Sequence, residues 1–333
     1  MKIAAISFTE KGHMTAMRLS ATATEHEVRL FAGIGGFENL AELTAAAWQS
    51  NDALVFICAA GIAVRAVAPL AARKSTDPAV LVIDELSRFV IPILSGHLGG
   101  ANSLAAQLAE RLGATAVITT ATDINGIFAV DEWAARSNCA IANIGAVKHV
   151  SSALLRGEAV GFHSDFEFNG ELPRGFCTRE ATKNKVIVSI HEGSANDENT
   201  LQIVPQIVTL GIGCRRGISA KAIRSFVFAV LCAANISPLA VECVASIDVK
   251  RDEAAILALA AELHAETRFF TAAELNSAKG GFTTSNFVAK TVGTGNVCER
   301  AAALASRGKL IIRKTMRDGI TVAAAVRTWR VEF

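Results

Sequence analysis

The sequence lacks the excess of positive charge that is typical of nucleic-acid-binding proteins. Its 333 residues include 33 lysines and arginines against 31 acidic residues, which gives a formal net charge of +2. Binding to nucleic acid without sequence preference requires a broad positive field. We therefore expect no nucleic-acid partner, and we expect any anionic ligand to be bound by a few local cationic groups.

Cysteine patterns of disulfide frameworks and zinc sites are also missing. The seven cysteines are scattered, odd in number and contain no C-x-x-C pair. This distribution fits a reducing compartment and favours no thiolate metal site. We predict a cytoplasmic protein that holds no metal and no cofactor of its own.

The chain also has no clear leader or membrane span. The apolar start "KIAAISF" ends at Thr9, which is too early for a signal peptide and the right length for a strand. Residues 53–72 carry a single charge, but Gly61, Arg65 and Pro69 interrupt them. This run predicts a buried strand, a glycine turn and a short helix, and we expect no membrane partner.

Strand-like and helix-like segments alternate along most of the chain. The first strand candidates are "KIAAISF", "EVRLFA", "ALVFICA", "AVLVID" and "TAVITT", and the alternation resumes near residue 206 after a stretch with many polar breaks. Such alternation predicts mainly parallel sheets. We predict an α/β protein with an N-terminal α/β domain over 1–139, a small irregular middle module over 140–205 and a second α/β domain over 206–333.

Glycine turns follow several of the predicted strands. In "GIAVRAV" from Gly61 and "GISAKAI" from Gly217, a basic residue, Arg65 or Lys221, comes in the first turns of the next helix. Helix N-termini offer free N–H groups to anions, and ligands of parallel sheets bind at the carboxyl ends of the strands. We expect Gly61, Arg65 and Lys221 to contact the substrate there.

The segment "SGHLGGANSLA" is the first candidate for chemistry. His97 could transfer protons, and the amides around the following glycines could stabilise a developing oxyanion. The alternative is a histidine that only caps or packs a tight turn. The residues that we expect to contact substrate here are Ser95, Gly99, Gly100 and Asn102.

Two carboxylates follow in "TTATDINGIFAVDEWA". Asp123 is a candidate for orienting His97 or relaying protons, so we assign it with His97 to catalysis. Its alternative role is in a turn through Asn125 and Gly126. Asp131 is better explained as the N-cap of the helix that follows.

The segment "LGIGCRRGISAKAI" contains a glycine spacing, G-x-G-x-x-x-G, that only weakly favours a dinucleotide site, because no acidic residue follows at the required distance. Arginine forks bind carboxylates in bidentate fashion. We therefore expect Gly213, Arg215 and Arg216 to bind an anionic substrate, together with Lys314 of a later hairpin. The alternative is that these charges are merely solvated.

These motifs together resemble a known family. Four segments carry the resemblance: "AAGIAVRAVAPL", the stretch from "DPAVLVIDELSRF" through "SGHLGGANSLAAQLAERLGATAVITTATD", "LGIGCRRGISAKAI" and "GKLIIRKTMRDGITVAAA". They are similar to the cobalamin biosynthesis protein G family, the cobalt-precorrin-5A hydrolases. The resemblance covers residues 1–150 and 206–326, and the middle segment more loosely.

The resemblance implies a hydrolase of vitamin B12 biosynthesis. Members open the δ-lactone of cobalt-precorrin-5A with water and release acetaldehyde, which leaves cobalt-precorrin-5B. The partner would be this small-molecule tetrapyrrole, whose cobalt belongs to the substrate, and a homo-oligomer stays open. The alternatives are a carrier that binds the intermediate without converting it and, less favoured, a nicotinamide oxidoreductase.

Such a substrate is a broad disc with an anionic edge, which suits scattered arginines and helix N-termini. We expect it to bind in the cleft between the two α/β domains. The polar segment 276–286, "NSAKGGFTTSN", is expected to be a flexible loop that could cover the substrate.

Overall fold

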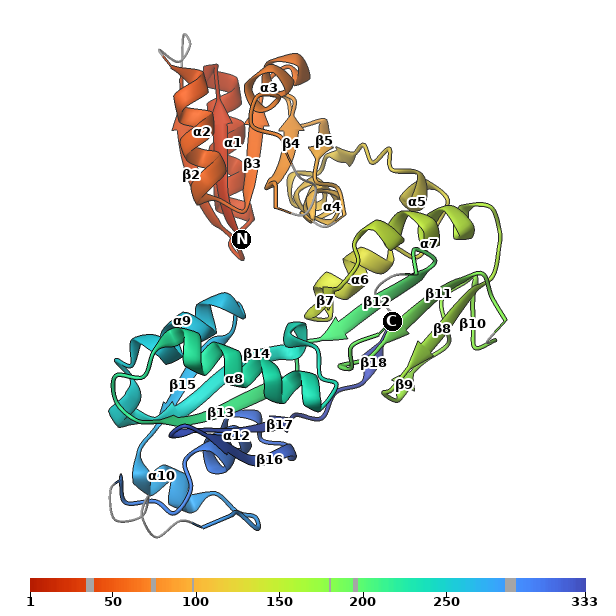
Figure 1. The fold of residues 1–333 in the computed structure, drawn as a ribbon. Coiled ribbons are helices and arrows are strands. Elements are labelled where there is room, and N and C mark those ends of the chain that lie inside the picture. The colour runs from red at the N-terminus through yellow and green to blue at the C-terminus, as the bar shows by residue number, and fades with distance from the viewer. Residues whose placement is uncertain (34–38, 73–75, 98, 180, 194–196, 285–291) are drawn as a thin grey trace. The chain divides into compact units, whose positions relative to one another are not determined.

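A computed structural model describes residues 1–333 except 34–38, 73–75, 98, 180, 194–196 and 285–291 (Figure 1). The chain divides into two compact units, Met1–Glu132 and Trp133–Phe333. This division comes seven residues before the boundary expected at 139. No described helix is both long and apolar enough to cross a membrane.

The first unit is built on a six-stranded sheet with the strand order β2-β1-β3-β4-β5-β6. Its strands are β1 (Lys2–Ser7), β2 (Glu27–Ala32), β3 (Ala53–Ile57), β4 (Ala79–Ile83), β5 (Phe89–Leu94) and β6 (Thr115–Ala116). Its helices are α1 (Glu10–Thr22), α2 (Leu40–Ser50), α3 (Ala60–Val67), α4 (Ala101–Leu112) and α5 (Ala121–Ile124).

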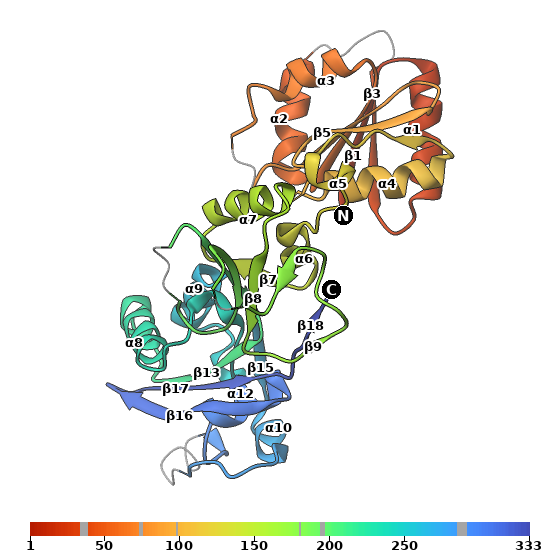
Figure 2. The same cartoon turned by 90° about the vertical axis from the view of Figure 1, so that its right-hand side faces the viewer.

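Helices cover both faces of this sheet (Figure 2). Because side chains alternate along a strand, Ile3 and Ala5 of β1 pack with α1 and α4, while Ala4 and Ile6 pack with α2 and α3. Burial on both faces explains why β3 is apolar at all five positions. The expected α/β architecture with mainly parallel strands is confirmed.

One strand of the first unit runs against the others, and the sequence did not predict it. β5 pairs antiparallel with β4 and carries Pro92, a residue that is rare inside sheets. Its carboxyl end therefore lies at the amino end of β4, where Leu94 pairs with Val80. The glycine loop that follows β5 therefore lies at the opposite end of the sheet from the turn at Gly61, which follows β3.

The second unit begins with a five-stranded sheet in the order β10-β8-β11-β12-β7. Three of its four pairings are parallel, so the middle module is more regular than expected. Its elements are α6 (Val130–Arg136), β7 (Cys139–Ile141), α7 (Gly145–Leu155), β8 (Val160–Ser164), β9 (Phe168–Asn169), β10 (Phe176–Cys177), β11 (Asn184–Val188) and β12 (Thr200–Pro205). Helix α6 crosses the boundary between the units, because its first three residues belong to the first unit.

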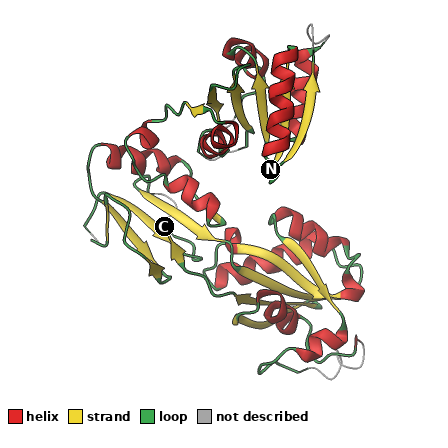
Figure 3. Cartoon of the chain, turned by 180° about the vertical axis from the view of Figure 1, so that it is seen from behind, coloured by secondary structure: helices red, strands yellow, loops and turns green. Residues whose placement is uncertain are grey.

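A second five-stranded sheet, in the order β15-β14-β13-β17-β16, completes this unit. Helices α8 and α9 pack on one face, and α10 and α12 pack on the other (Figure 3). The elements are β13 (Val208–Cys214), α8 (Ala220–Ala233), β14 (Val241–Ile247), α9 (Ala254–Glu262), β15 (Glu266–Phe270), α10 (Ala272–Ser277), α12 (Cys298–Ser306), β16 (Lys309–Arg317) and β17 (Ile320–Val326).

The last residues of the chain return to the middle module. Strand β18 (Val331–Glu332) pairs with β9, and the Phe333 ring stacks on Trp133 at 5.7 Å between ring centroids. The Trp133 indole also donates a hydrogen bond to the Glu332 carbonyl. Trp133 and the end of the chain therefore pack together, which accounts for Trp133 belonging to the second unit.

Candidate active site

The loop between β5 and α4 is tight and requires glycine. A Cβ on Gly99 would lie 2.4 Å from Ser95 Cβ, and one on Gly96 would lie 2.9 Å from Asn102 Oδ1. Gly100 has φ +78°, and Ser95, with φ +57°, adopts the same left-handed region although it is not glycine. This loop presents His97 at the end of β5.

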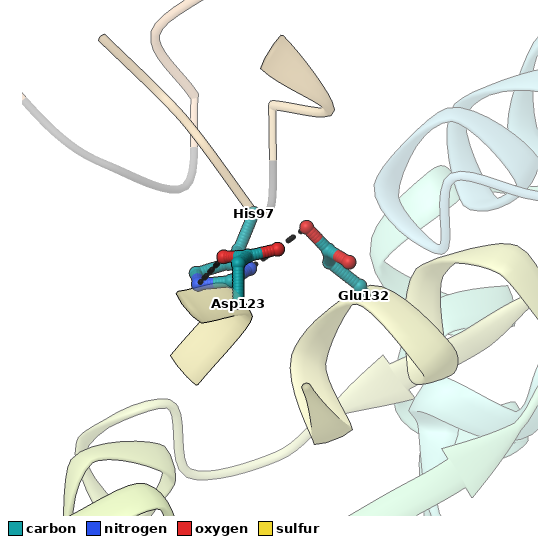
Figure 4. A group of neighbouring side chains, drawn as sticks. All are labelled: His97, Asp123 and Glu132. Carbon is teal, nitrogen blue, oxygen red and sulfur yellow. Dashed lines mark hydrogen bonds and ion pairs between the residues drawn. The ribbon is translucent and has the colours of Figure 1, made fainter. Parts of the chain in front are cut away.

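Three side chains, those of Glu132, Thr122 and Asp123, surround the His97 imidazole. Figure 4 draws two of them, Asp123 and Glu132. Its Nδ1 lies 2.7 Å from Glu132 Oε1, and its Nε2 lies 2.9 Å from Thr122 Oγ1 and 3.6 Å from Asp123 Oδ2. The His97 side chain is 18% exposed. The ring is thus held at both nitrogens while one side stays open to solvent.

Asn102 fixes the carboxylate that faces His97. Its Nδ2 donates to Asp123 Oδ2 at 3.1 Å and to Thr120 Oγ1 at 3.0 Å, and the residue is buried in the first turn of α4. Asp123 lies in α5, which follows β6, and β6 runs parallel to β5. Because the carboxyl ends of β5 and β6 meet at one sheet edge, the fold brings His97, Asn102 and Asp123 together as expected.

The carboxylates raise the pKa of His97. The hydrogen bond to Glu132 is the main cause, burial of the ring acts in the opposite direction, and the charges of Asp131, Glu132 and Asp123 add to the increase. The imidazolium form is therefore more populated at neutral pH than in an isolated histidine.

The amides of Gly100, Ala101 and Asn102 are not free for the oxyanion role expected of them. The N–H groups of Gly100, Ala101 and Asn102 donate to the carbonyl oxygens of His97, Ser95 and Gly96, respectively. These bonds close the loop onto the start of α4, so the three amides are not available to a ligand. The Ser95 hydroxyl, by contrast, is buried without a hydrogen-bond partner among the described residues.

Glu132 and Thr122 are site residues that were not predicted from the sequence. Thr122 precedes Asp123, and Glu132 follows Asp131 at the start of α6. The available signal was the acidic pair Asp131 and Glu132 in one helical turn. Asp131 is not the expected N-cap, because it lies inside the first turn of α6, where it is 8% exposed.

A cavity of about 590 Å³ in the second unit gathers another group of predicted residues. It lies beside the carboxyl ends of β13 and β14, where parallel sheets bind ligands. Apolar side chains such as Ile247, Val249 and Val297 line it. The predicted residues in its wall are Gly213, Arg215, Arg216 and Lys314.

Three of the four cations that line this cavity, Arg215, Arg216 and Lys314, are available to a ligand, whereas Lys250 forms an ion pair with Glu253 at 2.9 Å. Within the described parts of the chain, no carboxylate forms an ion pair with Arg215, Arg216 or Lys314. Arg216 donates only to the Val249 carbonyl, at 3.3 Å. An apolar cavity with free cations at its wall suits an apolar molecule that carries carboxylates.

A buried carboxylate supports one wall of the cavity. Glu299, with 0% exposure, accepts hydrogen bonds from the Lys314 and Thr283 N–H groups at 2.9 and 2.7 Å and from Asn296 Nδ2 at 2.9 Å. Burial raises the pKa of this carboxyl, but the hydrogen bonds from Lys314 and Thr283 outweigh it and lower the pKa below its usual value.

Gly61, Arg65 and Lys221 belong to neither group. Gly61 and Arg65 lie in α3 after β3, at the sheet edge opposite to His97, and the Arg65 guanidinium donates to the Gly61 carbonyl at 3.4 Å. Lys221 is exposed in the first turn of α8, does not line the cavity, and follows Ser219, whose side chain caps that helix.

The glycines near β13 have structural roles that do not involve a nucleotide. A Cβ on Gly211 would lie 1.8 Å from the Cys298 carbonyl oxygen, so α12 packs directly on the strand there. Gly217 has φ +74°, and its N–H donates to Glu253 Oε1. These contacts account for the glycine spacing of this segment, so a bound dinucleotide is not needed to explain it.

The segment 276–286 differs from the expected loose loop over its described part. Thr283 is bonded to Glu299, the Arg313 guanidinium donates to the Gly281 carbonyl, and Arg300 stacks over the Phe282 ring at 5.0 Å. Residues 276–284 are thus attached to α12 and β16. Residues 285 and 286 lie outside the described residues.

Three family models match successive parts of the chain. Cobalamin synthesis G N-terminal matches residues 42–123, Cobalamin biosynthesis central region matches 128–205, and Cobalamin synthesis G C-terminus matches 208–325. The last two ranges begin near α6 and β13, where the two sheets of the second unit begin.

Individual proteins agree with these matches. A cobalt-precorrin-5A hydrolase from Salmonella typhimurium is 38% identical over 88% of this chain and 86% of its own, and one from Priestia megaterium is 30% identical over 91% and 84%. A crystal structure of a cobalamin biosynthesis protein G homolog from Sulfolobus solfataricus has a TM-score of 0.41 at 26% identity, covering 98% of this chain and 97% of that chain. The resemblance inferred from the motifs is confirmed, and the chain belongs to the cobalamin biosynthesis protein G family.

Proposed function

We propose that this protein is a cobalt-precorrin-5A hydrolase. Water opens the δ-lactone of the substrate, and a two-carbon fragment leaves as acetaldehyde to give cobalt-precorrin-5B. Relatives at 38% and 30% identity carry the name of this activity. The observation that carries the proposal is a partly exposed imidazole, His97, whose Nε2 faces Asp123 while Glu132 holds Nδ1.

Binding of the substrate is proposed to depend on the cavity of the second unit. A tetrapyrrole with acetate and propionate arms has an apolar face and an anionic rim. The apolar wall of the cavity suits the face, and Arg215, Arg216 and Lys314 suit the carboxylates. Gly61, Arg65 and Lys221 remain proposed contacts to more distant arms.

The chemistry is proposed to start at His97. The neutral imidazole takes a proton from water as the water oxygen bonds to the lactone carbonyl carbon. The ring C–O bond of the lactone then breaks, and the departing oxygen takes a proton from the imidazolium or through Asp123. The products of this step are a free carboxylate arm and a hydroxyl on the two-carbon fragment.

Loss of the fragment follows as a carbon–carbon cleavage. The new hydroxyl gives up its proton and becomes the carbonyl of acetaldehyde, while the electron pair of the broken bond passes into the conjugated macrocycle. The cobalt of the substrate can help to accept this pair. This step requires a base at most, so the same imidazole can serve it.

The test is a reaction of the purified protein with cobalt-precorrin-5A. We expect acetaldehyde in amounts equal to the macrocycle converted, measured by a coupled alcohol dehydrogenase assay, and loss of turnover in His97→Ala. Binding of the substrate without acetaldehyde would support the carrier alternative. Unchanged turnover in a folded His97→Ala variant would refute the mechanism.

A further inference from the structure

We propose that His97 and Asp123 are ligands of a divalent metal ion of the zinc type, and that Glu132 positions the imidazole for it. The role of the ion in catalysis rests on the proposed function, but its binding does not. The sequence predicts no metal site, because its cysteines lack the spacing of thiolate ligands and the cobalt of the expected substrate can serve as the electron sink. The donor atoms here are one imidazole nitrogen and carboxylate oxygens.

The spacing of the donor atoms fits one ion. One donor atom from each of His97, Asp123 and Glu132 lies within 4.8 Å of the other two. His97 Nε2 and Asp123 Oδ2 are 3.6 Å apart. Two tetrahedral ligands, each about 2.1 Å from zinc, lie about 3.4 Å apart, so an ion can bridge these two atoms with little movement.

Both proposed ligands are held by neighbours in the way that metal ligands are. A ligating histidine commonly donates its other ring N–H to a carboxylate, which fixes the tautomer. Glu132 Oε1 lies 2.7 Å from Nδ1, so a proton on Nδ1 leaves the Nε2 lone pair facing Asp123 Oδ2 at 3.6 Å and the Thr122 hydroxyl at 2.9 Å, which an ion would displace. Asn102, which is 3% exposed, holds the Asp123 carboxylate.

The charge around the ring supplies a separate argument. Three carboxylates, Asp123, Asp131 and Glu132, act on His97. Across the described residues, no lysine or arginine forms an ion pair with any of them, and His97 is the only cationic partner that Asp123 and Glu132 have. Even with a charged imidazole, the group carries net negative charge, which a divalent cation would neutralise.

The ion would take over the activation of water. Two protein ligands leave positions open for water and for the lactone carbonyl oxygen. An ion lowers the pKa of its bound water to about 7 and polarises the carbonyl. With an ion held by His97 and Asp123, water would lose its proton to solvent as it adds to the carbonyl carbon, and the departing ring oxygen would take up a proton from solvent. His97 is then a ligand rather than the base.

Binding can be tested without turnover. We expect protein freed of metal with EDTA to bind one Zn²⁺ per chain in calorimetry, with Co²⁺ as a spectroscopic probe of the ligands. His97→Ala should abolish binding at this site, and Asp123→Asn should weaken it at least about tenfold. Glu132→Gln, which keeps a hydrogen bond but loses the charge, should weaken it about 10- to 100-fold.

His191→Ala is the matched control, because His191 is exposed and bonded to the Asn235 carbonyl in the second unit. Its affinity for Zn²⁺ should equal that of the unchanged protein. No stoichiometric binding, or binding that survives His97→Ala in a variant with a native circular dichroism spectrum, would overturn the proposal. Full turnover by the EDTA-treated protein would refute the catalytic role of the ion and leave His97 as the base, with the proposed hydrolase intact.

Discussion

Glu132 Oε1 lies 2.7 Å from His97 Nδ1, although 35 residues separate the two along the chain. The loop after β5 supplies the imidazole, and the first turn of α6 supplies the carboxylate. The contact fixes the ring so that Nε2 faces Thr122 and Asp123. Glu132 is therefore a positioning residue, whichever way His97 takes part in the chemistry.

Glu132→Ala should lower kcat about 10- to 100-fold and change KM less than twofold, because the variant loses the orientation of His97 but no substrate contact. Steady-state kinetics of acetaldehyde release would check this. Glu110→Ala, at an exposed position of α4, is the control and should leave both constants unchanged. An equal loss in both variants would contradict the positioning role.

Arg215→Ala and Lys314→Ala should act mainly on binding. A charge-assisted hydrogen bond contributes about 1.5–3 kcal/mol, so each variant should raise KM or Kd about tenfold or more with kcat within a few-fold. Fluorescence or absorbance titration with the substrate measures Kd directly. Arg156→Ala, which removes only an exposed ion pair with Glu158, should not change it. Unchanged affinity in both test variants would exclude the cavity as the substrate site.

Glu299→Gln should destabilise the protein in a pH-dependent way. The glutamine keeps its carbonyl oxygen for Thr283 and Asn296 and places its NH₂ group against the Lys314 N–H, at a cost of about 2–3 kcal/mol in the free energy of unfolding at pH 7. Because folding lowers the pKa of Glu299, its stabilisation is present above the usual glutamate value near 4.5 and is lost as the pH falls through the folded value.

Urea unfolding of both proteins between pH 7 and pH 3 would measure this difference. The difference in the free energy of unfolding between the unchanged protein and Glu299→Gln should become smaller as the pH falls toward 3. Glu262→Gln, which removes an exposed ion pair with Arg224, should cost at most about 1 kcal/mol and serves as the control. A gap that stays constant down to pH 3 would contradict the assigned ionisation.

Gly211→Ala should destabilise the second unit by about 3 kcal/mol or more, since the new Cβ would meet the Cys298 carbonyl at 1.8 Å and push α12 away from β13. Gly145→Ala is the control, because no atom lies within 4 Å of the Cβ there, and it should be neutral or slightly stabilising. Thermal unfolding would compare the two. Equal melting temperatures would show that the helix can move at no cost.

Much of the fold follows from local patterns. The strands at "KIAAISF", "EVRLFA" and "ALVFICA" agree with β1, β2 and β3 within a few residues, and the helix expected after Gly217 is α8. In each of these elements the apolar period or a cap such as Ser219 is a local property of the chain. β5 was missed because Pro92 weakens the strand pattern.

The site was only partly predictable, because only some of its residues are close together in the sequence. His97, Asn102 and Asp123 were found because glycines and polar residues cluster around them within short stretches. Glu132 could not be assigned to His97 without knowing that the chain from α5 to α6 returns to the loop. The occupied amides at Gly100 could not be foreseen either, because their carbonyl partners depend on the closed conformation of the loop.

Because β5 runs in the reverse direction, Arg65 and His97 lie at opposite ends of the strands of the first sheet. This separation limits the size of a molecule that could contact both residues. Arg65 follows the carboxyl end of β3, whereas His97 lies near its amino end, and the five residues of β3 span roughly 17 Å. A small ester that reacts at the imidazole is too short to reach Arg65. Only a ligand about as long as these strands, such as a macrocycle with extended arms, could contact both residues at once.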